Sequence, residues 1–385
     1  MAGASVARDV RARLEPRRAE MAALVGELVS IESPSDDAAG LVRMADRIEA
    51  LFREFGAIGR HPLGPGGAPH LDLRIDGPAR DDRVTLVLCH YDTVWPMGTL
   101  ARMPFAIDDA GVARGPGVLD MKGGIALLRY ALGELARLGT APKRPLRVLF
   151  TCDEELRSLT SRALIEDAAR TAAVAFVLES PLPGGVLKTA RKGTATYAVA
   201  IEGRAAHAGV EPEKGVNALS ELAMLIPAIH ALADPARGTT LNVGVARGGT
   251  RSNVVPAHAE AEVDVRTSSA SESERVDRAM LGLAPHLSGA RVAVTRRSHK
   301  PPMERTAATA ELFARARAIA AGMDVALGEG STGGGSDGNL TAAAGVPTLD
   351  GLGPEGEGAH AEHEHILVES LPRRAALIAG LLAEV

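Results

Sequence analysis

The stretch Val84-Thr-Leu-Val-Leu-Cys-His-Tyr-Asp92 decides the fold. Its first six residues, VTLVLC, form a short apolar run that predicts a buried strand ending at His90. Two later runs have the same character: LRVLFTC ends at Asp153 and AAVAFVL ends at Glu179. A Gly-rich turn and a helical stretch, 123–138, lie between the first two runs. Alternating strands and helices predict a largely parallel sheet covered by helices.

Each of the three predicted strands is followed by a side chain that can bind a metal. In open α/β sheets, ligands bind beyond the carboxyl ends of the strands. We therefore expect His90, the acidic run after Cys152 and Glu179 to gather at one edge of the sheet. This arrangement is the strongest physical indication of a functional site in the sequence.

The sequence pattern changes near Lys192. TATYAVAIEG, LNVGVARGG and AHAEAEVDVRT alternate like half-exposed strands, and 217–232 has helical periodicity. This pattern predicts a smaller α+β domain with an antiparallel sheet, 192–303. It is inserted between two parts, 1–191 and 304–385, of an α/β domain with helices on both faces of a largely parallel mixed sheet. A chain of 385 residues is long enough for two domains.

Composition excludes several function classes. The chain has 46% hydrophobic and 24% charged residues, which is typical of a soluble globular protein. Its net charge of -5, with no basic cluster, argues against a nucleic-acid partner. No apolar run reaches the roughly 18–20 residues of a membrane span. Because the N-terminal region lacks a signal-like apolar core, we expect a cytoplasmic protein in which Cys89 and Cys152 are buried thiols.

Four short motifs carry candidate metal chemistry. His90 and Asp92 form an H-x-D pair at a strand end, where Asp92 could orient the imidazole. Asp120 lies among glycines in GPGVLDMKGG, which would let the backbone approach an ion closely. Read alone, the first motif also fits a His before a turn, and the second a flexible surface turn.

Of the other two motifs, one is acidic and the other is rich in histidine. Glu154 and Glu155 follow the second strand, and adjacent glutamates suit two functions, binding a metal and activating water. They also fit the acidic beginning of a helix, which the helix dipole favours. His360 lies in GAHAEHEHI, where the residues alone do not distinguish it from two neighbouring histidines, His363 and His365.

Taken in order, these motifs resemble the M20 metallopeptidase family. HYDTVWPMGTL and GPGVLDMKGG are most similar to its carboxypeptidase G2-like, or glutamate carboxypeptidase, branch. The resemblance runs from about Ser30 to His365 and includes GRAAHAG, SNVVPA, VDVRT and TGGGSDGN. It implies a zinc-exopeptidase-like catalytic domain, formed by 1–191 and 304–385, and a lid or dimerisation role for 192–303. One departure stands out: the family usually has a Gly-Ser turn after the acidic pair, whereas this chain places the bulky, charged Arg157 there.

The resemblance also implies a role for each site residue. It implies two Zn²⁺ per chain, with Asp120 as the bridging carboxylate. One zinc would be held by His90 and Glu179, and the other by Glu155 and His360. Glu154 matches the general base, and His207 matches a histidine that reaches the partner subunit's site. Asp92, beside His90, is counted with them as a catalytic residue. Arg266, Asn253 and Gly335 match substrate-binding positions.

These roles predict a zinc-dependent metallocarboxypeptidase. Glu154 would activate a water between the zincs, and Arg266 would hold the carboxylate of the released, glutamate-type amino acid. The substrate is then a small molecule or peptide with a free carboxylate, and the enzyme a homodimer. The alternative is an N-acyl-amino-acid deacylase with the same two-zinc site. A non-catalytic zinc protein would not need Glu154, and the glycine-rich 328–338 segment lacks the G-K-[ST] of a phosphate-binding loop.

Overall fold

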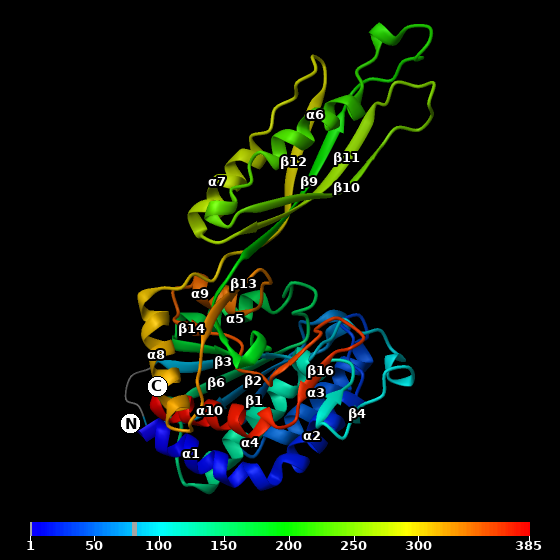
Figure 1. The fold of residues 1–385 in the computed structure, drawn as a ribbon. Helices are drawn as coiled ribbons and strands as arrows, with labels where there is room; N and C mark the ends of the chain where they lie inside the picture. Colours follow the sequence, from blue (N-terminus) through cyan, green and yellow to red (C-terminus); the bar gives the residue numbers. More distant parts are fainter. Residues whose placement is uncertain (1, 79–82) are drawn as a thin grey trace. The chain divides into compact units, whose positions relative to one another are not determined.

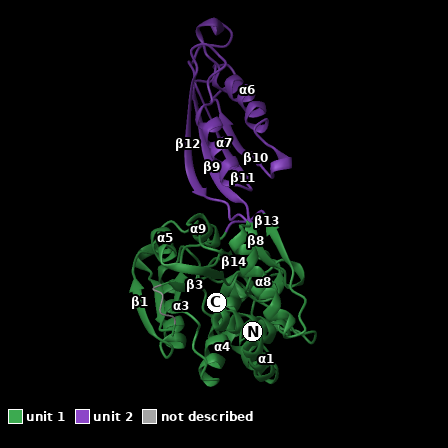
Figure 2. Cartoon of the chain, turned by 90° about the vertical axis from the view of Figure 1, so that its left-hand side faces the viewer, with its two compact units in different colours: residues 1–190, 305–332, 336–385 green, residues 191–304, 333–335 purple. Residues whose placement is uncertain are grey.

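The computed structural model of the protein describes residues 2–78 and 83–385. These residues form two compact units, coloured separately in Figure 2. Unit 1 comprises Met1–Ala190, Arg305–Thr332 and Ser336–Val385, and unit 2 comprises Arg191–Glu304 with Gly333–Gly335. The expected insert, 192–303, therefore differs from unit 2 by one residue at each end. Gly335, which we expected in the second part of the catalytic domain, groups with unit 2 instead.

Unit 1 is built on a six-stranded sheet in the order β1-β2-β6-β3-β7-β14. Strand β3 runs parallel to both β6 and β7, and β7 is parallel to β14, whereas β1 and β2 add an antiparallel edge. Its strands are β1 (Ala57–His61), β2 (His70–Ile75), β3 (Val84–His90), β6 (Leu146–Thr151), β7 (Ala172–Val177) and β14 (Thr348–Leu349). The central strands match the three apolar runs of the sequence.

Both faces of this sheet are covered by helices, as Figure 1 shows. Val87 and Cys89 of β3 are buried in the larger hydrophobic core, whereas Leu86 and Leu88 are buried in a second core with residues of α5 and α9. Alternate residues of a strand point to opposite faces, so burial of both faces explains why the run is apolar throughout. The helices of unit 1 are α1 (Ala2–Leu14), α2 (Arg18–Ser30), α3 (Ala38–Phe52), α4 (Gly123–Arg137), α5 (Arg162–Arg170), α8 (Ala307–Ala321), α9 (Gly338–Ala343) and α10 (Ser370–Glu384).

Small sheets complete unit 1. One has the order β15-β16-β5-β4, and the other pairs β13 with β8. Their strands are β4 (Ala106–Ile107), β5 (Val112–Arg114), β8 (Leu187–Arg191), β13 (Glu329–Thr332), β15 (Gly356–Glu357) and β16 (His365–Leu367). The sheet that contains β15 and β16 frames the turn that carries His360.

Unit 2 contains a four-stranded antiparallel sheet in the order β10-β11-β9-β12. Its strands are β9 (Gly193–Glu202), β10 (Thr240–Gly248), β11 (His258–Thr267) and β12 (Arg291–Lys300), and its helices are α6 (Ala218–His230) and α7 (Ala270–Leu281). Side chains of both helices share one core with inward-facing residues of the sheet, such as Tyr197 and Val263. The other face of the sheet is not covered by a helix of unit 2.

The predicted fold class is confirmed: a largely parallel mixed sheet with helices on both faces, and a separate antiparallel α+β unit. Cys89 and Cys152 are buried and free. None of the helices in the described residues is long and apolar enough to span a bilayer. The role of unit 2 as a lid or dimerisation domain stays a prediction.

Candidate metal centre and active site

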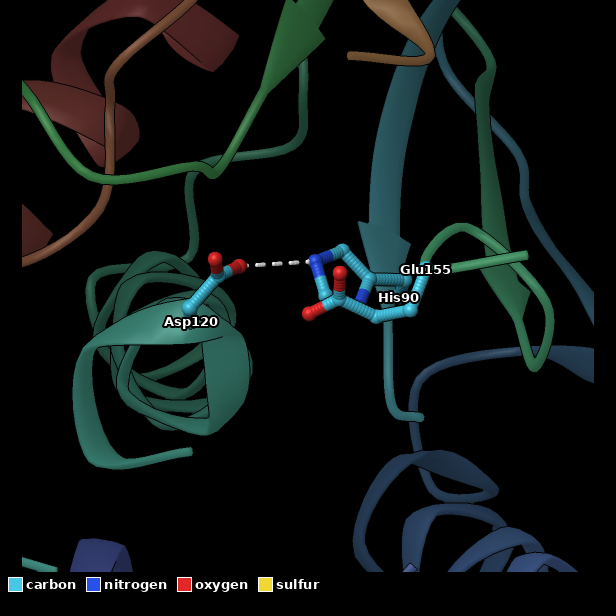
Figure 3. Close-up of side chains that lie close together, drawn as sticks. All are labelled: His90, Asp120 and Glu155. Atoms are coloured by element: carbon cyan, nitrogen blue, oxygen red, sulfur yellow. Dashed lines mark hydrogen bonds and ion pairs between the residues drawn. The ribbon is translucent and has the colours of Figure 1, made fainter. Parts of the chain in front are cut away.

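His90 ends β3 with its side chain almost fully buried. Its Nε2 atom lies 2.9 Å from Oδ1 of Asp120 and 3.4 Å from Oε1 of Glu179. Figure 3 shows the carboxylate of Asp120 pointing at the His90 ring, with Glu155 beside it. One ligand atom from each of His90, Asp120 and Glu155 lies within 4.8 Å of the other two. Three strand ends and the loop before α4 thus place four potential ligands together.

His360 joins this cluster from the turn between β15 and β16. Its Nε2 atom lies 3.2 Å from Oδ2 of Asp120 and 3.2 Å from Oε2 of Glu155. The two oxygens of Asp120 therefore face two different imidazoles, because Oδ1 faces His90. By contrast, Nδ1 of His365 lies 2.9 Å from the backbone oxygen of His363. The structure thus distinguishes His360 from its two neighbours, which the sequence alone did not.

Asp92 is fully buried behind His90 and holds two strand ends together. Nδ1 of His90 lies 3.1 Å from the Asp92 backbone oxygen and 3.4 Å from its Oδ1. The Asp92 carboxylate also accepts hydrogen bonds from the backbone N–H groups of Glu154 (3.2 Å) and Glu155 (3.1 Å), and from the Ser35 hydroxyl (2.8 Å). Asp92 therefore directs Nε2 of His90 toward the other ligands and fixes the turn that carries both glutamates.

The electrostatics of the cluster follow from these contacts. Burial lowers the pKa of His90, but hydrogen bonds to Asp120, Asp92 and Glu179 outweigh burial and raise that pKa well above its ordinary value. Hydrogen bonds to Asp120 and Glu155 raise the pKa of His360 to about 10. Burial raises the pKa of Glu155 to about 7, and the charge of Glu154 contributes to this shift. The carboxylates therefore create a negative potential that favours positive charge at the centre of the cluster.

This donor set fits a divalent metal centre. Imidazole nitrogens and carboxylate oxygens are ligands that zinc accepts, and the His90 ring is oriented by the contacts of its Nδ1 with Asp92. A carboxylate that faces two imidazoles from its two oxygens, as Asp120 does, suits a bridging ligand. A cation would also supply the positive charge that the buried carboxylates require. Which of these residues bind metal stays a prediction.

The turn after β6 presents the acidic pair and has an unusual backbone. Arg157 and Ser158 both adopt left-handed conformations, with φ of 67° and 57°. The N–H of Arg157 donates to the Glu154 carbonyl at 2.7 Å, and the N–H of Ser158 donates to the Asp153 carbonyl at 2.8 Å. The Ser158 hydroxyl also donates to Asp337. Arg157 thus occupies a conformation that favours glycine, at the position where the resembling family has a glycine-containing turn.

Glu364 is a site residue that the sequence analysis missed. It is fully buried, and its carboxylate accepts hydrogen bonds from Trp95 Nε1 (2.7 Å) and from the backbone N–H groups of Gly117 (3.0 Å), Leu119 (2.9 Å) and Asp120 (3.1 Å). Burial raises the pKa of Glu364. Glu364 thus fixes the loop that presents Asp120. In the sequence, the only indication of this role is that an acidic residue stands four positions after His360.

The remaining predicted site residues belong to unit 2. His207 and Asn253 are exposed and lie on adjoining loops, since the N–H of Ala208 donates to the Asn253 carbonyl at 3.0 Å. Arg266 lies on β11, and its guanidinium forms an ion pair with Asp264. The backbone oxygen of Gly335 lies 3.4 Å from Nη1 of Arg191. These residues are not part of the cluster described in unit 1.

Known proteins resemble the chain over most of its length. A family model described as Peptidase family M20/M25/M40 matches residues 86–384. Carboxypeptidase G2 from Pseudomonas sp. (strain RS-16) is 32% identical over 368 residues, which cover 93% of this chain and 87% of that protein. The structure of aminopeptidase PepT from Bacillus cereus ATCC 10987 has a TM-score of 0.77 and 25% identity, with 95% of this chain and 98% of that chain covered.

A more distant structure shares the fold. The YXEP protein of Bacillus subtilis, described as a dinuclear metal binding peptidase from the M20 family, has a TM-score of 0.70 and 16% identity, and the match covers 95% of this chain and 97% of that chain. The family match, the identity to carboxypeptidase G2 and the shared fold agree with one another. The chain belongs to peptidase family M20/M25/M40 and is a peptidase hydrolase whose relatives include carboxypeptidases.

Proposed function

We propose that this chain is a zinc-dependent hydrolase that cleaves an amide bond and releases a C-terminal, glutamate-type amino acid from a peptidyl or acyl group. The observation that carries the proposal is the buried cluster around Asp120, whose two oxygens face His90 and His360. The identity to carboxypeptidase G2 supports the same activity.

The proposed ligand assignment is the one that the resemblance to the family implies. His90 and Glu179 would hold one zinc ion, Glu155 and His360 the other, and Asp120 both. The contact of Glu179 with His90 and that of Glu155 with His360 support this division. When bound, the two ions would lower the pKa of a water molecule and polarise the scissile carbonyl.

Glu154 is the general base of the proposed mechanism. It adjoins Glu155 on a turn that Asp92 fixes by two backbone hydrogen bonds, and its charge acts on the Glu155 carboxyl. In the proposed reaction it accepts a proton from the attacking water and delivers it to the leaving nitrogen. Asp92 does not touch the substrate in this mechanism; it positions His90 and the acidic turn.

The substrate-binding residues would come from unit 2. Arg266 would bind the free carboxylate through its guanidinium, and the loop at Gly335 would line the pocket. His207 would donate a hydrogen bond to the scissile carbonyl oxygen. The backbone N–H of Gly209 donates to Nδ1 of His207 at 3.2 Å. In the neutral ring, this bond leaves the proton on Nε2, where it can be donated.

The geometry of unit 2 supports a homodimer. Arg266 pairs with Thr240 and Thr194 at one end of β11, whereas Asn253 precedes His258, at the other end of that strand. Eight residues separate His258 from Arg266, which corresponds to about 26 Å along a strand. One substrate is too small to contact both ends. We therefore propose that Arg266 acts within one chain and that His207 and Asn253 are supplied by a second copy.

A panel of peptidyl and N-acyl amino acids tests this function, with the enzyme zinc-loaded or treated with a chelator. We expect zinc-dependent release of glutamate. Faster release from short N-acyl substrates such as acetyl-amino acids than from peptides would favour the deacylase alternative. Hydrolysis of no substrate, or hydrolysis that chelation leaves unchanged, would contradict the proposal.

A further inference from the structure

A buried carboxylate of unit 1, outside the metal centre, is held by three arginines. Glu134 lies near the C-terminal end of α4, and its side chain is only 1% exposed. It accepts hydrogen bonds from Nε of Arg13 at 2.7 Å, from Nη1 of Arg17 at 2.6 Å and from Nη1 of Arg137. Burial raises the pKa of Glu134, but the hydrogen bonds from Arg13 and Arg137 outweigh burial and lower that pKa below its ordinary value. Glu134 is therefore a charged carboxylate that fixes three guanidinium groups.

The cluster carries more positive than negative charge. Arg17 also donates from Nε and Nη2 to the two oxygens of Glu20, at 2.8 and 2.7 Å. Three guanidinium charges against the two carboxylate charges of Glu134 and Glu20 leave an excess of one positive charge. All three nitrogens of Arg17 donate to carboxylates, so the excess charge rests on Arg13 and Arg137. The side chains of these two arginines are 47% and 51% exposed, so solvent reaches them.

Arg13 and Arg137 each keep two nitrogens for a further acceptor. Arg13 binds Glu134 through Nε, which leaves Nη1 and Nη2, and Arg137 binds it through Nη1, which leaves Nε and Nη2. Among the residues that the structure describes, these two side chains form no other hydrogen bond or ion pair. Because both guanidinium groups contact one carboxylate, they lie close enough for one small ligand to contact both. Glu134 thus holds two neighbouring pairs of N–H donors that solvent can reach.

Two adjoining cavities lie over this cluster. One, of about 590 Å³, is lined by Arg13, Arg17, Glu20, Glu134 and Arg137. The other, of about 360 Å³, shares Arg17, Glu20 and Arg137 with the first and is also lined by Leu24, Leu51 and Tyr130. The first cavity offers only charged side chains to a ligand, whereas the second adds apolar and aromatic surface. The pair therefore fits a ligand in which an anionic group is attached to an apolar group.

We propose that Arg13 and Arg137 bind the phosphate group of a phosphate monoester. A planar carboxylate is satisfied by one pair of N–H donors, whereas a tetrahedral phosphate dianion has enough oxygens for both pairs and a charge that matches two guanidinium groups. Glu134 would hold the two arginines in place, so that less side-chain entropy is lost on binding. The organic part of the ester would lie against Leu24, Leu51 and Tyr130 in the second cavity.

This site is separate from the metal centre. Asp120 precedes Gly123, the first residue of α4, whereas Glu134 lies eleven residues further along that helix, about 16 Å away along its axis. Binding of the ester therefore needs neither the metals nor the proposed hydrolase function, and the test measures affinity rather than catalysis.

Calorimetric titration of the full, zinc-loaded chain with inorganic phosphate and with phenyl phosphate tests the site. We expect both to bind, and phenyl phosphate to bind more tightly because its ring reaches the second cavity. Arg13→Met and Arg137→Met should each raise the Kd of phenyl phosphate roughly 10- to 100-fold, as expected for loss of hydrogen bonds between charged groups. The matched control is Arg18→Met, which removes an exposed arginine that pairs with Glu15 and lines neither cavity. It should change the Kd by less than about twofold.

Three results would overturn the proposal. Unchanged Kd values in both arginine variants would show that the anion binds elsewhere, for example at the metals. An equal rise in Arg18→Met would show attraction by surface charge rather than a site. Equal affinity for the two probes would exclude the ester and leave free phosphate as the ligand.

If the arginine variants do not fold, the unmodified protein still decides. Phenylglyoxal modifies exposed arginines, and mass spectrometry of the fragments identifies them. Phenyl phosphate should slow the modification of Arg13 and Arg137 but not that of Arg18. Equal rates of modification with and without the ester would overturn the proposal, and the hydrolase activity would remain a separate question.

Discussion

The two units organise their candidate residues in opposite ways. In unit 1, side chains from the ends of β3, β6 and β7 converge with His360 on the Asp120 carboxylate, largely buried and held by neighbours such as Asp92 and Glu364. In unit 2, the candidate residues are distributed over both ends of one sheet. In the proposed mechanism, unit 1 supplies the metal centre by itself. Arg266 and His207 lie toward opposite ends of the sheet of unit 2, so we propose that two copies of the chain supply them to one substrate.

The largest expected effect concerns the metals of unit 1. Removing them with a chelator should abolish activity, and zinc should restore it, because in the proposed mechanism the metals lower the pKa of the attacking water and polarise the scissile carbonyl. Five ligands cannot all serve one tetrahedral ion, so metal analysis should find about two zinc ions per chain. A zinc-saturated protein with one ion or fewer would show that the ligand division is wrong.

The next largest effect concerns the general base. Glu154→Gln should retain both metals and lower kcat roughly 10²- to 10⁴-fold, since an amide cannot accept the proton. The matched control is Glu362→Gln, which removes an exposed carboxylate close to His360 in sequence and should leave kcat unchanged. If Glu154→Gln keeps more than half of the activity with its metals bound, another group is the base.

The smallest effect is structural and concerns the turn that carries the acidic pair. Arg157 has a φ of 67°, a conformation that disfavours side chains with a Cβ atom. Arg157→Gly should therefore be more stable than Arg157→Ala by about 0.5–1 kcal/mol, the reverse of the usual order of these residues. Both variants lack the Arg157 side chain, so the difference between their free energies of unfolding in urea isolates the backbone effect. Equal stability, or a more stable alanine variant, would show that the turn changes conformation.

Much of the reaction centre could be predicted because it follows strands with a clear pattern. The runs that became β3, β6 and β7 are apolar on both faces, and each is followed by a polar residue. Similarly, α4, Gly123–Arg137, differs by one residue from the helical stretch expected at 123–138. These features are local in the sequence, so the sequence alone is enough to recognise them.

Long-range contacts could not be predicted in the same way. Glu364 is recognisable as a site residue only through Trp95 and the backbone around Asp120, which lie more than 240 residues away. The face of the sheet on which Lys300 lies depends on a bulge between Arg296 and Ser298 of β12. Without that extra residue, simple alternation from Val292 would turn Lys300 toward the helix-covered face. The orientation of Lys300 is thus a property of the strand register, which the sequence pattern does not specify.

The division of the active site between two copies is tested most directly by mixing two inactive variants. His207→Ala keeps Glu154 but cannot supply the histidine, and Glu154→Gln supplies the histidine but lacks the base. With random exchange of subunits, half of the dimers are mixed and each has one complete site, so about a quarter of the unmodified activity should return. No recovery in a verified mixed dimer, or full activity of His207→Ala alone, would show that each chain works by itself.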